Sequence, residues 1–209
     1  RGNISQHPNN TYASYFVNNG NLTVNGSIND FYKVTNSGTL TVLGNINSTY
    51  YYMCEPDASL TITGNLNDYV NATAGSIYLI GTEQQTIHSG NYHNLYTLNS
   101  NGIKYGDEGQ YSFTGEFLLN GNPLDNNGVY SRIQSAEVKL DTVSDYKDIL
   151  FMCDYTLNHD LNAKIKVYSR HTLTIPENSD VTITNDISRL AEGNYASYFV
   201  NNGNLTVNG

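Results

Sequence analysis

The chain lacks tryptophan and has little cysteine, proline or positive charge. Its 209 residues contain no Trp, two Cys and four Pro, and ten Lys and Arg stand against nineteen Asp and Glu. With a formal net charge of −9, the chain has no basic patch to neutralise phosphates, so we expect no nucleic-acid partner. No apolar run approaches the roughly 20 residues that a membrane-spanning helix needs, so we expect no membrane insertion.

Asn, Gly, Thr and Tyr fill the positions that Lys and Glu occupy on a typical helical surface. The sequence holds 18 Gly and 18 Tyr, while charged residues make up only 14%. These residue types form turns and strands and are poor helix formers. Since 38% of the residues are hydrophobic, the chain can bury a core, and wholesale disorder is not expected. The composition therefore favours an all-β fold.

One stretch of sequence occurs twice without a substitution. The sequence YASYFVNNGNLTVNG spans positions 12–26 and again positions 195–209, so that Leu22 corresponds to Leu205. We therefore divide the chain into one complete repeat unit, residues 1–183, and the first coil of the next identical unit, residues 184–209. A long unit that is repeated this faithfully indicates a tandem array in a larger protein, of which this sequence is a piece.

A finer period runs inside the unit. The segments GNLTVNGSIN, GTLTVLGNIN, ASLTITGNLN and GSIYLIGTEQ follow one another between positions 20 and 84. Each alternates apolar and polar residues, as a strand with one buried face does. Strands that recur every ~20 residues with turns between them predict a β-solenoid. The positions predicted to lie in its core are Leu22, Val24, Leu40, Val42, Leu60 and Ile62.

A second strand-like stretch precedes each of the first three segments: SYFVNNG, FYKVTNSG and YYMCEPDA. Aligned on the small residue that follows, Phe16, Val34 and Cys54 share one predicted core column. With strands about 4.8 Å apart, about nine coils in one unit would make a rod roughly 40 to 45 Å long. The whole chain then has nine to ten coils. In the second copy we expect Leu205 and Val207 to pack on the coil before them.

Residues 81–128 carry a recognisable series of short motifs. Gln-Thr-Ile at 85–87, Asn-Leu at 94–95 and Gly-Ile at 102–103 precede Thr-Gly at 114–115, after which come Phe117, Leu119 and Gly121. HTLTIPENSDVTI from His171 adds a further coil of the same type. This cadence resembles the repeats of filamentous-haemagglutinin-like adhesins, which are large bacterial surface proteins. The likeness covers about three quarters of the chain and fades most in residues 129–170, where we expect coils with irregular turns or an inserted loop.

The resemblance implies a right-handed parallel β-helix from a secreted protein on the bacterial cell surface. It implies an extended adhesive stalk or binding rod, with a host-surface glycan or protein, or neighbouring repeats of the same protein, as partners. Two alternatives remain. The chain would be a polysaccharide lyase or hydrolase if converging acids and a basic residue lined a cleft. It would be the delivery rod of a large exported toxin if the parent protein carried a toxic domain.

The sequence offers little material for catalysis. Cys54 and Cys153 are separated by about five coils, so we expect no disulfide and interpret Cys54 as a buried thiol. His88 and His93 are close in sequence but form no metal-binding motif. Asp107 and Glu108 point to opposite faces of a strand unless their turn reorients one of them.

A second acidic cluster comprises Asp141, Asp145 and Asp148, near Lys139 and Lys147. Sugar-cleaving β-helices need converging carboxylates, often with Ca²⁺, and solvated turns are the simpler interpretation here. We therefore expect no enzymatic activity and no cofactor, with Ca²⁺ the one metal that these acids leave open.

The candidate contact surface is aromatic. In Tyr50, Tyr51 and Tyr52 the alternation of a strand exposes at least one ring. An exposed tyrosine can stack on a sugar ring and still offer its hydroxyl to water or ligand. We take these three residues as the candidate ligand contacts.

Overall fold

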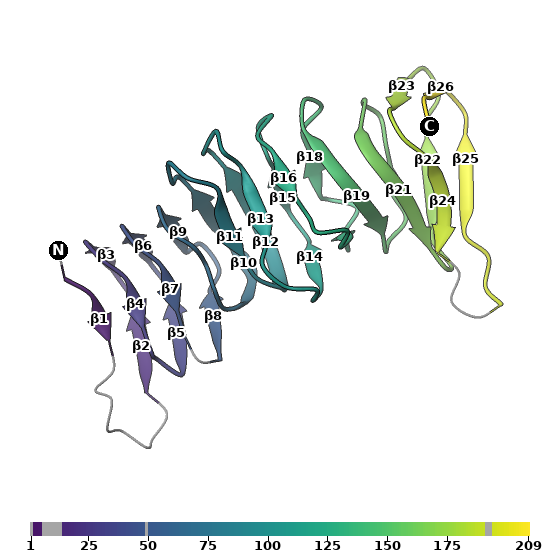
Figure 1. The fold of residues 1–209 in the computed structure, drawn as a ribbon. Helices are drawn as coiled ribbons and strands as arrows, with labels where there is room; N and C mark the ends of the chain where they lie inside the picture. The colour runs from purple at the N-terminus through teal and green to yellow at the C-terminus, as the bar shows by residue number, and fades with distance from the viewer. Residues whose placement is uncertain (1, 6–13, 49, 191–193) are drawn as a thin grey trace.

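The computed structural model describes residues 2–5, 14–48, 50–190 and 194–209. Within these ranges every regular element is a strand, and no helix is present that could cross a membrane. The chain winds into a parallel β-solenoid of about ten coils, with its N-terminus at one end of the stack and its C-terminus at the other (Figure 1). The predicted all-β class and the number of coils are confirmed. Each coil has three strand positions, which we call faces A, B and C in chain order.

Face A is the longest stack. Ten strands follow one another along it, each paired in parallel with the next. They are β2 (Tyr15–Asn18), β5 (Lys33–Asn36), β8 (Tyr51–Cys54), β10 (Tyr69–Leu79), β12 (Gly90–Thr97), β14 (Tyr111–Phe113), β17 (Ser131–Ile133), β19 (Asp145–Phe151), β21 (Asn162–Tyr168) and β24 (Ile187–Leu190).

Faces B and C complete the coils. The second halves of β10 and β12 turn onto face B. The other strands of face B are β3 (Asn21–Val24), β6 (Thr39–Val42), β9 (Ser59–Ile62), β15 (Glu116–Leu118), β18 (Lys139–Leu140), β20 (Tyr155–Thr156), β22 (Thr172–Ile175) and β25 (Tyr198–Asn201). The strands of face C are β1 (Ile4–Ser5), β4 (Ile28–Asn29), β7 (Ile46–Asn47), β11 (Gln85–Ile87), β13 (Ile103–Tyr105), β16 (Leu124–Asp125), β23 (Asp180–Ile183) and β26 (Asn204–Val207).

Alternation along each strand builds the core. In β6 the side chains of Leu40 and Val42 point inward and are buried, while Thr39 and Thr41 face outward. The register stacks like on like, since Leu40 lies between Leu22 and Leu60 in the neighbouring coils. Of the predicted core positions, all are buried except Leu22, which is half-buried in the outermost described coil of face B. Burial of such stacked apolar side chains is the main stabilising term of the fold.

Asparagine ladders brace the turns. Asn47 donates its side-chain amide to Asn29 in the coil before it at 2.8 Å, and Asn67 donates to Asn47 at 2.7 Å. Each amide thus satisfies a neighbour at the same point of the next coil, as the repeated Ile/Leu-Asn of the sequence template predicts.

One predicted column is wrong. Phe16 and Val34 do stack, but the next member is Tyr52, and Cys54 stacks instead on Asn36 and Asn18. The third coil carries extra residues in the turn after Cys54, where Asp57 adopts a left-handed φ of 62°. The small residue used to align the sequence segments lies beyond that turn. The alignment therefore put Cys54 in the column that Tyr52, two positions earlier, occupies.

Two other expectations concern the C-terminal half. Residues 129–170 form coils with strands on faces A and B and the Leu161–Ile183 bridge on face C, and the register shifts between Asp145 and Asp148 where β19 pairs with β21. In the last coil, Leu205 pairs with Val181 and packs against the core, and Val207 pairs with Ile183. The predicted packing of the second copy on the preceding coil is confirmed.

Candidate functional site

The three candidate tyrosines differ in exposure. Tyr50 is 57% exposed, Tyr51 is half-buried, and Tyr52 is completely buried in the core. Because Tyr51 and Tyr52 are adjacent in β8, their side chains point to opposite sides of the sheet. The prediction of Tyr52 as a ligand contact is therefore wrong, and Tyr50 and Tyr51 remain.

Neighbouring coils extend this aromatic surface. The strand register places Tyr15, Lys33, Tyr51 and Tyr69 in one row along face A. Tyr32 and Tyr50 precede two of these residues and lie beside the row. We call the surface the tyrosine strip and define it by Tyr15, Tyr32, Tyr50, Tyr51 and Tyr69.

The rings of the strip contact one another from coil to coil. Tyr32 and Tyr50 stack with centroids 4.8 Å apart and planes 3° from parallel. Tyr15 meets Tyr32 edge to face at 5.9 Å, and the ammonium of Lys33 lies 5.0 Å from the centre of the Tyr51 ring. These contacts hold the rings in place, so little rotamer entropy remains to be lost when a ligand binds.

A hollow opens at one end of the strip, between its third and fourth coils. It has a volume of about 460 Å³ and is lined by Tyr50, Tyr51, Tyr69 and Asn71. The hydroxyl of Tyr69 accepts a hydrogen bond of 3.3 Å from the side chain of Asn91. Aromatic faces with amide and hydroxyl groups between them suit a flat, hydroxyl-rich ligand.

Three members of the strip, Tyr15, Tyr32 and Tyr69, were missed in the sequence. The members of the row, from Tyr15 to Tyr69, follow one another in the sequence at one constant interval. The same interval separates Tyr32 from Tyr50. Since Leu22 and Leu40 of the core also share that spacing, the same period would have placed the aromatic residues in one outward row. The signal lies in this constant interval and not in the run of three adjacent tyrosines.

A smaller aromatic pair lies on face B. Tyr78 and Tyr96 stack at 4.8 Å, and the Tyr96 hydroxyl donates to Glu116 at 2.7 Å. The Lys139 ammonium also donates to Glu116 at 2.7 Å. The hydrogen bond from Lys139, followed by that from Tyr96, lowers the pKa of Glu116, which therefore stays ionised. The pair gives a second stacked aromatic surface with a different polar neighbourhood.

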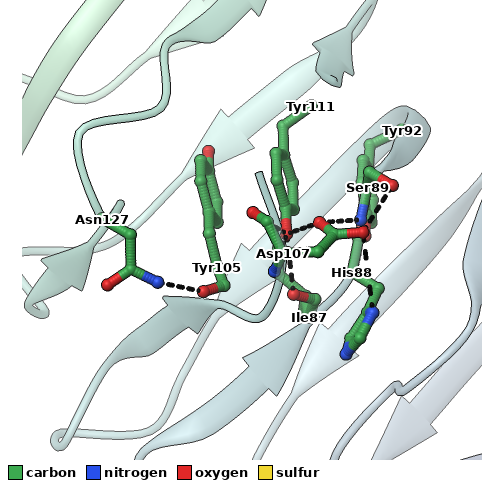
Figure 2. A network of polar contacts seen from close by, with 8 residues as sticks. All are labelled: Ile87, His88, Ser89, Tyr92, Tyr105, Asp107, Tyr111 and Asn127. Atoms are coloured by element: carbon green, nitrogen blue, oxygen red, sulfur yellow. Dashed lines mark hydrogen bonds and ion pairs between the residues drawn. The ribbon is translucent and has the colours of Figure 1, made fainter. Parts of the chain in front are cut away.

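Ser89, His88 and Asp107 form a polar cluster at a turn of face C (Figure 2). Such residue types invite comparison with a nucleophile and its base. The Ser89 hydroxyl, however, donates to Asp107 at 2.8 Å, and the imidazole of His88 lies 3.7 Å from the same carboxylate. Tyr111 donates to the other oxygen of Asp107 at 2.5 Å. The cluster therefore works as a brace between coils, because the serine hydroxyl points its proton at the carboxylate and not at the imidazole.

Burial alone would raise the pKa of Asp107. The hydrogen bonds from Tyr111 and Ser89 outweigh that effect, so the pKa of Asp107 lies below its ordinary value. Glu108, its neighbour in sequence, is not among the residues of the network drawn in Figure 2. In the pair at 107–108, hydrogen bonds thus hold the Asp107 carboxylate at the turn.

The carboxylates of the second acidic cluster are also held by neighbouring groups of the protein. Asp141 accepts main-chain N–H groups of Leu119 and Asn120, both at 2.9 Å. Asp145 pairs with Lys147, and Asp148 accepts the Asn126 amide at 3.0 Å. Across the residues that the structure describes, no three His, Cys, Asp or Glu side chains gather in a metal-binding group.

The two cysteines are free thiols. Cys54 is buried in the core, and Cys153 is half-buried. Burial raises the pKa of both thiols, to about 11 for Cys153, so neither is activated as a thiolate at neutral pH. Cys54 packs as a small apolar side chain, as the sequence interpretation has it.

Comparison of the chain with protein-family models, with curated proteins and with solved structures found no match in any of the three.

Proposed function

We propose that this chain is a repeat module of a large secreted bacterial surface protein, and that it forms an extended rod that contacts a host-surface glycan or protein. The resemblance of residues 81–128 to adhesin repeats supports the cellular setting. The observation that supports the adhesive role is the tyrosine strip, which lies outward along four coils of a continuous stack.

The strip has the chemistry of a glycan contact. The faces of Tyr50 and Tyr51 offer apolar area to the C–H groups of a sugar ring, and their hydroxyls remain available to its hydroxyl groups. Tyr32 fixes the orientation of Tyr50 by stacking on it. Because coils repeat about every 4.8 Å, the strip presents rings in a line, which suits successive units of an extended polysaccharide.

Weak single contacts are sufficient in this arrangement. If the unit recurs in a tandem array, equivalent strips are linked on one rod, and binding of one raises the effective concentration of the others. Avidity then provides the strength that a single shallow hollow of about 460 Å³ lacks.

A glycan-binding screen of the chain and two matched variants tests the proposal. The strip variant is Tyr50→Ser with Tyr51→Ser, and the control is Tyr78→Ser with Tyr96→Ser, which removes the stacked pair on face B. Tyr52 is left intact because it is part of the core. We expect the strip variant to lose at least tenfold in affinity for the bound glycans and the control to bind like the parent. Equal binding by all three, or no binding by the parent to any glycan, would contradict the role of the strip.

A further inference from the structure

The two copies of the repeated sequence lie on different faces of the solenoid. In the first copy, YFVN forms β2 on face A and NLTV forms β3 on face B. In the second copy, YFVN forms β25, which pairs with β22 on face B, and NLTV forms β26, which pairs with β23 on face C. The strands begin and end at equivalent residues in the two copies. Each strand of the second copy, however, lies on the face that follows the face of its equivalent in the first copy.

The strand order gives the size of the shift. The path along face A from β2 to β24 contains ten strands and therefore nine steps of one coil each. Phe199 lies on β25, one strand beyond β24. The chain from Phe16 to Phe199 thus spans nine coils and one further strand. Ile4 on face C and its equivalent Ile187 on face A show the same shift.

The coil itself is preserved. In the first copy one turn carries Ile4, Phe16 and Leu22 on its three strands, and in the second copy one turn carries Ile187, Phe199 and Leu205. The second turn rests on three apolar side chains of the preceding coil, namely Ile165, Leu173 and Val181. Since every face offers the same inward apolar pattern, a coil can begin on any of them without loss of packing.

The last coil leaves its upper surface open. A hollow of about 490 Å³ there is lined by residues that include Ile187, Phe199, Leu205 and Val207. Val207 is 42% exposed, whereas its equivalent Val24 is 3% exposed because β6 covers it. In the first copy the strands that cover this same sequence are β4, β5 and β6. The open surface therefore fits one occupant best, a segment with the sequence of residues 27–42.

We propose that the segment which covers this surface belongs to the next unit of the array, and that successive units are turned by one strand, a third of a coil, about the rod axis. The tyrosine strip then moves to the next face with each unit and returns to its first face after three. The rod presents equivalent strips on three sides. This inference rests on the proposed function, because it requires units in tandem.

Disulfide trapping in the existing chain tests the phase of the second copy. Thr174 and Val200 are register partners on face B, so Thr174→Cys with Val200→Cys should cross-link on mild oxidation. If the unit held a whole number of coils, Val200 would lie on face A beside Lys166, the partner of Ser188 in this structure. The matched variant is therefore Lys166→Cys with Val200→Cys. Peptide mapping identifies the joined thiols, and Cys54 and Cys153 serve as internal controls.

We expect the pair at 174 and 200 to link nearly completely and the pair at 166 and 200 not to link. Linkage of the second pair, or of neither, would overturn the inference. A crystal structure of a chain of two units, residues 1–183 followed by residues 1–209, then locates both strips. If both strips lay on the same face of a continuous rod, the proposed rotation between units would be wrong and the proposed function would still stand. Two separate bodies without a continuous stack would overturn the proposed function itself.

Discussion

A single core side chain in this solenoid is held between the coils on either side of it. Leu40 lies between Leu22 and Leu60 and is fully buried, whereas Leu22 is half-buried at the end of the described stack of face B. We predict that Leu40→Ala lowers the free energy of unfolding by about 2 to 5 kcal/mol. Leu22→Ala should cost clearly less, since less apolar surface is lost. Urea denaturation of both variants measures the difference, and equal costs would contradict the assigned stack.

Asp107 makes the free energy of unfolding depend on pH. Its folded pKa lies below the ordinary value of about 3.9, so its contribution to stability is fully present above that pH. The contribution is lost as the pH falls through the folded pKa, because protonation breaks the hydrogen bonds from Ser89 and Tyr111. We predict that Asp107→Asn, which cannot titrate, shows a smaller loss of unfolding free energy between pH 6 and pH 3 than the parent. A loss of equal size would show that other carboxylates carry the acid sensitivity.

The sequence placed individual core residues well wherever apolar and polar residues alternate in the template segments. Leu40, Val42, Leu60 and Ile62 were assigned to the core from the alternation alone, and each is buried. The error in the core column, with Cys54 in the place of Tyr52, arose because the turn after Cys54 is longer than its predecessors. An alternating strand fixes which residues share a side, but it does not fix how many residues a turn takes, and that number decides the column.

Turns are the elements in which glycine matters most. Gly102 and Gly128 both adopt a left-handed φ, of 73° and 76°. A Cβ at Gly102 would meet the backbone carbonyl oxygen of Pro123 in the next coil, whereas a Cβ at Gly128 would meet open space. We predict that Gly128→Ala costs only the strain of the left-handed conformation, roughly 1 to 2 kcal/mol. Gly102→Ala should cost more, because two coils must also separate, and thermal unfolding of the two variants compares them directly.

Strands as elements were predictable to different degrees along the chain. The template segments gave β3, β6 and β9 because apolar and polar residues alternate there without interruption. Residues 129–170 lack that template. Their strands include the long β19, whose register with β21 shifts where Lys147 adopts a left-handed φ of 61°. The tyrosine strip was only partly foreseen because it is a property of stacked strands, which a search along one strand does not reveal.

At the scale of the whole molecule, the coil is the unit that can be added or removed. Residues 22–39 form one complete coil, whose removal joins Asn21 to Leu40 and keeps every face in phase. We predict that this deletion leaves a folded, cooperatively unfolding solenoid that is shorter by about 4.8 Å. Removal of residues 22–30 alone, half a coil, puts the segment before the cut out of phase with the coils that follow, so it should lower the unfolding temperature more than removal of the whole coil does. Circular dichroism during heating distinguishes the two outcomes.

Small-angle X-ray scattering of the chain beside a chain of two units, residues 1–183 followed by residues 1–209, tests the rod most directly. The added unit spans nine coils and one strand, so we predict a maximum dimension greater by about 45 Å at an unchanged cross-sectional radius. A smaller increase with a larger cross-section would mean that the units fold as separate or side-by-side bodies. That result would contradict the account of this protein as a segment of one continuous rod.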